Sequence, residues 1–529
     1  MNLDLILTAA ALVLAIGALL VEYKRTLMML QQNSYRPERY RKYLQTSGET
    51  TSWSHLLAMV IALGAYLSPT PTWLAACAIG LYSLYSIAFE VGKKYKKPLV
   101  WTPRAKRIYG VMLVVPVVAV LLTLIVPAGS IAQMLRWMAV WVMAAYCLSP
   151  GVAMFAVWAL KPVEKHINNG YINDARRILQ SMPGLTVIGI TGSYGKTSTK
   201  HYLNRILSEK FSVCMTPGSF NTTLGVVRTV REYLKPYNEV FICEMGAKNL
   251  GDIKEICDLV HPSIGIVTAV GPQHLESFKT IENVQRTKFE LIDALPKGGL
   301  AVVNDDFEYV ANRPVENVAV VRYGIKPRPE VKFAVGSLSY SATGTDFNVL
   351  TPDGELKLHT RLVGECNVSN LVAAVIVALH LGVSEQQIRY AVEKIEQVEH
   401  RLSVKRTPGG ITIIDDAFNS NPTGSGMALD VLAAMRPGKR IVITPGMIEL
   451  GDRQEELNEE FGRKIARSVD VAIIVGQYNR DAILEGIGTP EGVRVEPVDS
   501  FADAQRLLAT IAASGDTVLY ENDLPDTFK

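Results

Sequence analysis

Residues 189–197 read GITGSYGKT and decide the fold of the chain around them. The run 185–190 is apolar and β-branched, which predicts a buried strand, and residues 198–210 predict the helix that follows it. Glycines at a strand-to-helix turn let the backbone point its N–H groups at phosphate oxygens, and the helix N-terminus adds a positive dipole end. The sequence therefore predicts a cradle for the phosphates of a nucleoside triphosphate.

Five residues of this loop are expected to bind the nucleotide: Gly192, Ser193, Gly195, Lys196 and Thr197. A lysine in this position reaches the outer phosphates, and a threonine hydroxyl holds Mg²⁺. The spacing departs from the general motif Gly-x-x-x-x-Gly-Lys-[Ser/Thr], because Ile190 stands in place of the first glycine. A purely structural turn is the alternative, which Gly-Lys-Thr at a strand-to-helix junction disfavours.

Three more blocks accompany the loop. Residues 241–247 (FICEMGA) form an apolar run with the carboxylate of Glu244 at its end, residues 268–278 read TAVGPQHLESF, and residues 415–422 read DDAFNSNP. Together with the loop they resemble the Mur ligase family, the ATP-dependent ligases that build the peptide stem of the bacterial cell wall. The third block is similar to the Asp-Ser-Tyr-Asn-Ala-Asn-Pro signature of the D-alanyl-D-alanine-adding branch. The resemblance covers about residues 175–529.

The second half of the chain predicts two α/β domains. Alternating strands and helices over residues 185–397 indicate a mostly parallel sheet, interrupted by hairpins in residues 331–362. A second α/β unit begins near Arg401 and has the size of a Rossmann-like domain. The expected fold is therefore an α-helical transmembrane region followed by α/β, with a P-loop central ATPase domain (185–397) and a Rossmann-like C-terminal domain (398–529).

An amide-forming ligase has to activate a carboxylate, which ATP does by forming an acyl phosphate that an amine then attacks. The enzyme must neutralise charge on the transferring phosphoryl group and hold the reactants in line. Lys196 and, on the strength of the resemblance, His274 and Lys288 are the expected catalytic residues. Thr197, Glu244 and, again from the resemblance, His274 are the expected metal ligands. Thr197 and Glu244 offer hard oxygen donors to a first Mg²⁺.

The resemblance adds two roles near the metals. It implies that His274 helps to bind a second Mg²⁺ and that Lys288 is carbamylated, so that a cation becomes a carboxylate-like anion. A packed histidine and a solvated lysine are the ordinary alternatives.

The resemblance also assigns residues to the nucleotide and to the substrate. Asn367 and Asn370, in the stretch GECNVSN, are expected near the base, although Cys366 replaces the histidine usual in the family. Six further positions fall in stretches that resemble family contacts with the nucleotide or the other substrates. Arg401 and Asp416 are expected at the nucleotide, or else are a surface arginine and a capping aspartate. The expected substrate-binding residues are Asn221, Thr222, Asn419 and Asn421.

The first 160 residues hold most of the excess apolar content of this 48% hydrophobic chain. Residues 3–21 are long enough to span a bilayer, and further apolar stretches follow at about 54–68, 72–89, 108–127 and 135–158. They predict a membrane domain (1–160) of five spans, give or take one, and then a linker helix within residues 161–184. A cleaved signal peptide fits poorly, since Asp4 replaces a basic start and more spans follow.

Loop charge predicts the orientation of these spans. Residues 24–42 and 93–107 are rich in Lys and Arg, whereas the turns at 68–72 and 128–133 carry neither. By the positive-inside rule the basic loops and everything after Lys161 are expected to be cytoplasmic. The resemblance to the Mur ligases implies that the membrane is the inner membrane of a bacterial cell. Six cysteines without a Cys-x-x-Cys pair support neither a zinc ribbon nor a disulfide framework, and the net charge of +3 does not imply nucleic acid.

The membrane region stands where Mur ligases carry the domain that binds the uridine diphosphate of their substrate. We therefore expect a membrane-bound ligase that uses ATP and Mg²⁺, two ions in all, to join an amino acid or dipeptide to a cell-envelope precursor. The acyl substrate could be carried on a polyprenyl lipid, or be a different polymer. Two alternatives stay open: a membrane polyglutamate-type synthase, and a non-catalytic protein of envelope assembly or transport that uses nucleotide as a switch.

Overall fold

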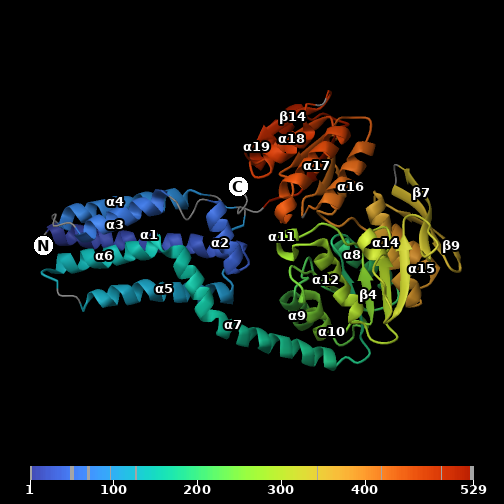
Figure 1. Ribbon diagram of the computed structural model, residues 1–529, viewed down its shortest axis with the longest axis horizontal. Coiled ribbons are helices and arrows are strands. Elements are labelled where there is room, and N and C mark those ends of the chain that lie inside the picture. The colour runs from blue at the N-terminus through green and yellow to red at the C-terminus, as the bar shows by residue number, and fades with distance from the viewer. Residues whose placement is uncertain are drawn as a thin grey trace. The chain divides into compact units, whose positions relative to one another are not determined.

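The computed structural model describes residues 3–47, 53–67, 72–93, 95, 97–125, 128–341, 344–418, 420–489 and 491–524. The chain forms two compact units, one that is mostly residues 1–167 and one that comprises residues 168–523 (Figure 1). We call them the helical unit and the ligase unit. Most of the predicted turn at 68–72, and two lysines of the basic loop at 93–107, lie outside the described residues.

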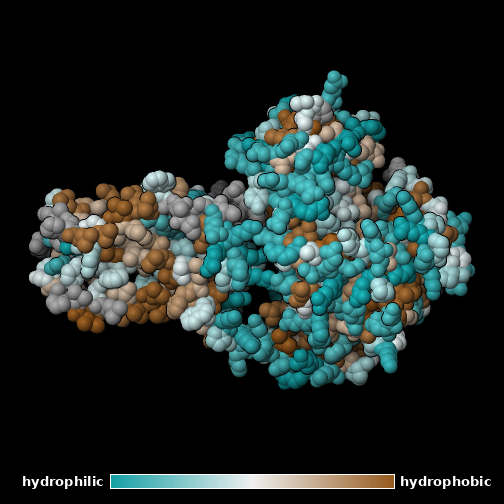
Figure 2. All heavy atoms as spheres, in the orientation of Figure 1, coloured by the Kyte–Doolittle hydropathy of each residue, from teal (hydrophilic) through white to brown (hydrophobic). Residues whose placement is uncertain are grey.

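Long helices build the helical unit. Their bounds are α1 Leu3–Gln32, α2 Pro37–Thr46, α3 Trp53–Leu67, α4 Thr72–Val91, α5 Pro103–Thr123, α6 Ile131–Cys147 and α7 Ser149–Gln180. Small side chains such as Ala15, Ala18 and Ala153 are fully buried between them, which allows close approach of the helices. Large apolar side chains such as Leu63 and Leu81 face outward, and brown patches cover much of this unit in Figure 2.

Two of the described helices are long and apolar enough to cross a membrane, α1 and the part of α4 from Trp73 to Val91. The pair α6 and α7 passes the same test only together, and the two are bent by 75° at Leu148. By length and composition, the described helices therefore fall short of the five spans expected. Helix α3 has 15 residues, about 22 Å against a hydrocarbon core of ~30 Å. Helix α5 begins among the cations Arg104, Lys106 and Arg107.

The expected linker helix is the last part of α7, which runs unbroken from Ser149 to Gln180. Its sequence changes from apolar to polar near Lys161, with Pro162 inside the helix. The composition shift that predicted a boundary at residue 160 therefore marks a change from apolar to polar side chains within one helix.

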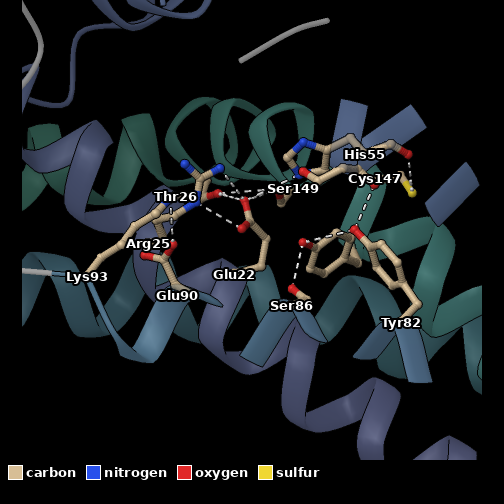
Figure 3. A network of polar contacts seen from close by, with 12 residues as sticks. Glu22, Arg25, Thr26, His55, Tyr82, Ser86, Glu90, Lys93, Cys147 and Ser149 are labelled. Carbon is tan, nitrogen blue, oxygen red and sulfur yellow. Dashed lines mark hydrogen bonds and ion pairs between the residues drawn. The ribbon is translucent and has the colours of Figure 1, made fainter. Parts of the chain in front are cut away.

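A buried polar network joins α1, α3, α4, α6 and α7 (Figure 3). Glu22 is 5% exposed, and its Oε1 accepts hydrogen bonds from Thr26 and Ser149, each at 3.1 Å. Arg25 Nε lies 3.0 Å from Glu22 Oε2, and His55 Nε2 lies 3.5 Å from Glu22 Oε1. Hydrogen bonds and ion pairs between helices in an apolar bundle fix the positions of the helices relative to one another.

A nine-stranded sheet forms the first lobe of the ligase unit, in the order β2-β3-β1-β4-β5-β6-β7-β8-β9. Its strands are β1 Thr186–Thr191, β2 Val213–Met215, β3 Val240–Glu244, β4 Ile264–Val267, β5 Leu300–Asn304, β6 Ala319–Gly324, β7 Phe333–Ser341, β8 Gly344–Thr351 and β9 Gly354–Thr360. Strands β1 to β7 pair in parallel and β7 to β9 antiparallel, so the hairpins predicted in residues 331–362 are confirmed.

Helices cover both faces of this sheet. They are α8 Lys196–Leu207, α9 Thr223–Glu232, α10 Asp252–Val260, α11 Leu275–Phe278, α12 Ile281–Asp293, α13 Glu308–Ala311, α14 Glu365–His380 and α15 Glu385–Glu393. One core lies under α8, α14 and α15, and the other under α9, α10 and α12. Because both faces are covered, β1 is apolar from Val187 to Ile190, with Ile188 and Ile190 fully buried.

A six-stranded sheet, β10-β11-β15-β12-β13-β14, forms the second lobe. Its strands are β10 Ser403–Arg406, β11 Thr412–Asp416, β12 Arg440–Thr444, β13 Val471–Val475, β14 Arg494–Val498 and β15 Thr517–Glu521. Its helices are α16 Pro422–Ala434, η2 Gly451–Arg453, α17 Gln454–Ser468, α18 Arg480–Ile487 and α19 Phe501–Ile511. All strands but β10 run parallel, so an α/β unit follows residue 401 as predicted.

Candidate nucleotide and metal site

The predicted loop joins the end of β1 to the start of α8. Gly195 caps α8 with φ +83°, and a Cβ there would lie 2.4 Å from Asn370 Oδ1. A Cβ on Gly192, at φ +150°, would lie 2.1 Å from Thr268 Oγ1. Both positions therefore need glycine for their backbone angle and for lack of space. The first amides of α8 have no partner within the helix, which leaves them for an anion.

The block 268–278 packs against this loop. Ser193 N donates to Ala269 O (2.8 Å), and Ser193 Oγ donates to Gly271 O (3.1 Å). Thr268 Oγ1 donates to Tyr194 O at 2.5 Å. The two predicted blocks thus form one structure, and Ser193 uses its amide and its hydroxyl to shape the loop.

Lys196 is the first residue of α8, and its side chain turns back toward the loop that precedes the helix. Its Nζ donates to Gly192 O (2.6 Å) and to Ser193 O (3.2 Å). Burial lowers the pKa of Lys196 to about 8, while the Glu244 carboxylate acts in the opposite direction. The ammonium therefore lies at the mouth of the cradle that the loop forms.

Glu244 ends β3 and is 1% exposed. Its Oε1 accepts from Thr197 Oγ1 (3.2 Å) and Asn221 Nδ2 (3.0 Å), and its Oε2 lies 2.9 Å from Lys200 Nζ. Burial favours a raised pKa for Glu244, but the charges of Lys200 and Lys196 outweigh it and lower that pKa below its usual value. Glu244 is thus a carboxylate held in its ionised form.

Thr197 and Glu244 fit Mg²⁺. Two ligands at right angles around Mg²⁺ are about 2.9 Å apart, close to the 3.2 Å between Thr197 Oγ1 and Glu244 Oε1. No group of three His, Cys, Asp or Glu side chains in the described part of the chain could hold a metal ion. Mg²⁺ at this place would take its other ligands from phosphate and water, as it usually does.

His274 precedes α11, at φ +53°, and its Nδ1 shares a short hydrogen bond with the carboxylate of Glu449. Burial lowers the pKa of His274, and Glu449 partly offsets this. Lys248 Nζ lies 3.0 Å from Glu449 Oε1. The sequence did not predict Glu449, which belongs to the loop between β12 and α17.

Lys288 lies on α12, is 1% exposed and has its Nζ 5.9 Å from the centroid of the Phe278 ring. Within the described ranges its side-chain Nζ makes neither a hydrogen bond nor an ion pair. Burial, with help from the charge of Lys196, lowers the pKa of Lys288 to about 7. Burial therefore favours the neutral form of this amine, which is the form that reacts with carbon dioxide.

Asn367 and Asn370 lie on α14 and face α8. Asn367 Oδ1 accepts from Tyr202 OH (2.8 Å), and Asn370 Oδ1 accepts from Thr199 Oγ1 (3.2 Å). Both asparagines are buried, and burial raises the pKa of neighbouring Cys366 to about 12. In this structure the two asparagines hold the helix of the phosphate loop in place.

Arg401 and Asp416 come from the segment that opens the second lobe. An Nη of Arg401 lies 3.5 Å from Thr197 Oγ1, and its guanidinium lies 4.1 Å from the centroid of the Phe418 ring. Asp416 Oδ1 accepts from Leu402 N (3.0 Å), and burial raises the pKa of Asp416 to about 6. The structure thus brings Arg401 to the predicted Mg²⁺ ligand Thr197.

The expected substrate residues divide into two groups. Asn221 contacts Glu244, whereas Thr222 caps α9 by accepting from Gly225 N (3.3 Å). Asn421 caps α16 by accepting from Gly424 N (2.9 Å). Asn419 lies outside the described residues. Thr222 and Asn421 therefore have a local structural role that their sequence also explains.

The arrangement combines free helix amides, a lysine, a buried carboxylate and a hydroxyl at the carboxyl ends of parallel strands. Ligands of open α/β sheets bind at this edge. The excess of cations, with Lys196, Lys200 and Arg401 around Glu244, matches the charge of a metal-bound triphosphate.

Comparison with known proteins supports the same assignment. Residues 190–378 match the Mur ligase middle domain, and residues 400–520 match the family described as Mur ligase, glutamate ligase domain. The UDP-N-acetylmuramoyl-tripeptide–D-alanyl-D-alanine ligase of Mycobacterium bovis is 33% identical over 358 residues, which cover 64% of this chain and 70% of that protein. The ligase of the same name from Bacillus subtilis is 27% identical over 352 residues, covering 66% and 75%.

A solved structure agrees with these matches. The MurF ligase from Thermotoga maritima in complex with ADP has a TM-score of 0.61 and 26% sequence identity, covering 67% of this chain and 80% of that one. Neither family match includes residues before Ile190.

Proposed function

Because the chain belongs to the Mur ligase family and is an ATP-dependent ligase, we propose that it is membrane-bound and acts through an acyl phosphate. Its acyl substrate is a cell-envelope precursor, and its amino donor is an amino acid or dipeptide. The observation that carries the proposal is the convergence of Lys196, Thr197 and Glu244 beside the free amides of α8.

The chemistry divides into two transfers. A carboxylate oxygen of the acyl substrate attacks the γ-phosphorus of ATP, the bond to ADP breaks, and an acyl phosphate forms. The amine then attacks the acyl carbon, loses a proton, and phosphate leaves with the oxygen that the carboxylate supplied. Both steps spread negative charge over phosphoryl oxygens, so positioned cations lower both barriers.

This chain's residues have separate tasks in these steps. Lys196 moves from its own loop carbonyls to the outer phosphates, and Arg401 adds charge from the second lobe. Thr197 and Glu244 would hold the first Mg²⁺, which when bound neutralises phosphate charge. Lys200 keeps Glu244 ionised. His274 and a carbamylated Lys288 would hold the second Mg²⁺, and burial of Lys288, which favours its neutral amine, supports that modification.

The substrate follows from the relatives and from the helical unit. The Mycobacterium bovis and Bacillus subtilis relatives are named for ligation of D-alanyl-D-alanine to a UDP-N-acetylmuramoyl tripeptide. We propose the same donor class here, with an acceptor presented at the cytoplasmic face of the bacterial inner membrane, carried on a lipid. Helices α1 and α4 are long and apolar enough to cross the membrane, and the bent pair α6 and α7 offers a third span for a multi-pass domain.

Purified full-length protein in lipid nanodiscs tests this proposal. Phosphate release from ATP and amide product are measured with a lipid-linked or a uridine-nucleotide-linked acyl substrate, each with D-alanyl-D-alanine or glutamate. The proposal expects ligation with the lipid-linked substrate and the dipeptide. Preference for the soluble nucleotide-linked substrate would contradict the membrane role, and nucleotide binding with no amide product from any pair would contradict the ligase.

A further inference from the structure

The loop between β12 and α17 belongs to the second lobe and reaches the first lobe beside His274. Glu276 N donates to Glu449 O at 3.2 Å, and a Cβ on Gly451 would lie 3.2 Å from Glu276 N. Glu449 itself has φ +63°, a backbone conformation that costs free energy in a residue with a side chain. The loop is therefore shaped to deliver this side chain to this place.

The Glu449 carboxylate lies between two groups of the first lobe. Its Oε2 shares the short hydrogen bond with His274 Nδ1, and its Oε1 lies 3.0 Å from Lys248 Nζ. The side chains of Glu449 and His274 are 18% and 20% exposed. The contact is partly shielded from water, so the attraction is stronger than in a pair on an open surface. It therefore holds the His274 ring in one orientation more firmly.

A histidine that binds a metal through one ring nitrogen commonly donates its other N–H to a carboxylate, which fixes the tautomer and turns the ring. Here Nδ1 is the nitrogen that meets the carboxylate. A neutral ring that donates from Nδ1 keeps the lone pair of Nε2 for a metal. His274 belongs to the first lobe and Glu449 to the second, so contact between the lobes is what brings this carboxylate to the ring.

We propose that Glu449 is a positioning residue that sets the tautomer of His274 and presents its Nε2 to the second Mg²⁺. This inference rests on the proposed function. It makes completion of the second metal site depend on the contact between the two lobes that brings Glu449 to His274. The alternative role is an ion pair to Lys248 that only ties the lobes.

Mn²⁺ binding to full-length protein with a non-hydrolysable ATP analogue separates these roles. Bound Mn²⁺ is counted by electron paramagnetic resonance in wild type, Glu449→Ala, Glu449→Gln, Lys248→Met and the control Glu455→Gln. Glu455 is an exposed acid in the first turn of α17. The wild type is expected to bind two Mn²⁺ ions, and loss of the carboxylate to weaken the second about 10- to 100-fold.

The conservative variant distinguishes orientation from tethering. Glu449→Gln keeps an oxygen that can accept from Nδ1 but loses the ion pair, so its second Mn²⁺ should weaken less than in Glu449→Ala. Lys248→Met and Glu455→Gln should leave the second ion unchanged. Equal Mn²⁺ binding by wild type and Glu449→Ala, or an equal loss in Lys248→Met, would overturn the inference.

The wild type provides the check on the premise. A single nucleotide-dependent Mn²⁺ ion in the wild type also overturns the inference, but it leaves the ligase intact. Failure of the wild type to bind any Mn²⁺ with the nucleotide would count against the proposed function instead.

Discussion

Lys200 Nζ lies 2.9 Å from Glu244 Oε2, and neither side chain is more than 1% exposed. Lys200 also donates to Gly218 O at 2.5 Å. The cation thus occupies one oxygen of the carboxylate and leaves the other, with Thr197 and Asn221, at the predicted metal position. This pair explains how a carboxylate with almost no access to water stays ionised.

Lys200→Met should destabilise the ligase unit and raise the Mg²⁺ concentration needed for half-maximal phosphate release. Removing one partner of a buried ion pair costs about 3–5 kcal/mol, because the other charge stays buried. Loss of the largest opposing charge also raises the pKa of Glu244, so more of it is protonated and unable to bind metal. Thermal unfolding and a Mg²⁺ titration measure both effects.

The control for this variant is Lys254→Met, which removes an exposed lysine that pairs with Asp258. It should change neither measurement. Adding Glu244→Gln to Lys200→Met should recover part of the lost stability without activity, and a double variant less stable than Lys200→Met would contradict the pairing.

Lys196→Ala should lower the turnover of ligation by at least ~10³, since it removes a charge that stabilises the transferring phosphoryl group. Folding should persist, because the loop glycines and the contacts of Ser193 with Ala269 and Gly271 remain. Single-turnover phosphate release measures the loss, with exposed Lys297→Ala as control. Near-normal ligation would refute the assignment of this loop to ATP.

Lys288→Ala should be almost inactive, and short carboxylates should restore part of the activity by replacing the carbamate. The carbamate forms from the neutral amine, whose pKa of about 7 lies below that of an ordinary lysine. Activity should therefore fall as the pH drops through about 7 and level off above it, and bicarbonate should raise it near neutral pH. A ¹³C carbamate resonance after labelling with ¹³C-bicarbonate would identify the modification, and its absence from active protein would contradict it.

Glu22→Ala should destabilise the helical unit without changing nucleotide binding. It leaves Arg25, Ser149 and Thr26 without their shared acceptor inside an apolar bundle (Figure 3). All six tryptophans lie between Trp53 and Trp158, so tryptophan fluorescence follows the unfolding of this unit selectively. Glu38→Ala, an exposed acid on α2, serves as control. An unchanged unfolding transition in Glu22→Ala would show that the network does not hold the bundle.

The sequence predicted those parts of the site in which residues close together in the chain place the functional side chains. The strand, the glycine loop and the helix of residues 186–207 follow from hydrophobic pattern and turn residues, and they bring Lys196 and Thr197 to one place. The strand ending at Glu244 pairs with β1 in register, with Ile190 opposite Glu244. A buried strand that ends in a carboxylate was therefore enough to predict that Glu244 lies beside the phosphate loop.

The missed residues depend on contacts between distant segments. Glu449 meets His274 across 175 residues, and no local pattern marks that pair. Lys200 did carry a signal, because it follows Lys196 by one helical turn and so faces the same side of α8. Asn367 and Asn370 hydrogen-bond to Tyr202 and Thr199 in this structure, and their place near the base stays a prediction. Their amides serve packing as readily as recognition, which a sequence pattern does not distinguish.

The number of spans shows the same limit. Composition predicted five apolar stretches, but α3 is too short and the stretch at 135–158 is broken by the 75° bend between α6 and α7. The break lies at Leu148, just before Pro150, which has no backbone N–H to continue the hydrogen bonding of a helix. The sequence marks this position with Pro150-Gly151, but a hydropathy average passes over it.

Transfer of ¹⁸O from the acyl substrate to phosphate tests the central claim most directly. Full-length protein in nanodiscs is given ATP, the amino donor and an acyl substrate whose reacting carboxylate carries ¹⁸O, and the released phosphate is analysed by mass spectrometry. An acyl-phosphate ligase should release one phosphate per amide formed, and each phosphate should carry one oxygen from the carboxylate. Phosphate without the label, or ATP hydrolysis that continues with no amide product, would contradict the account.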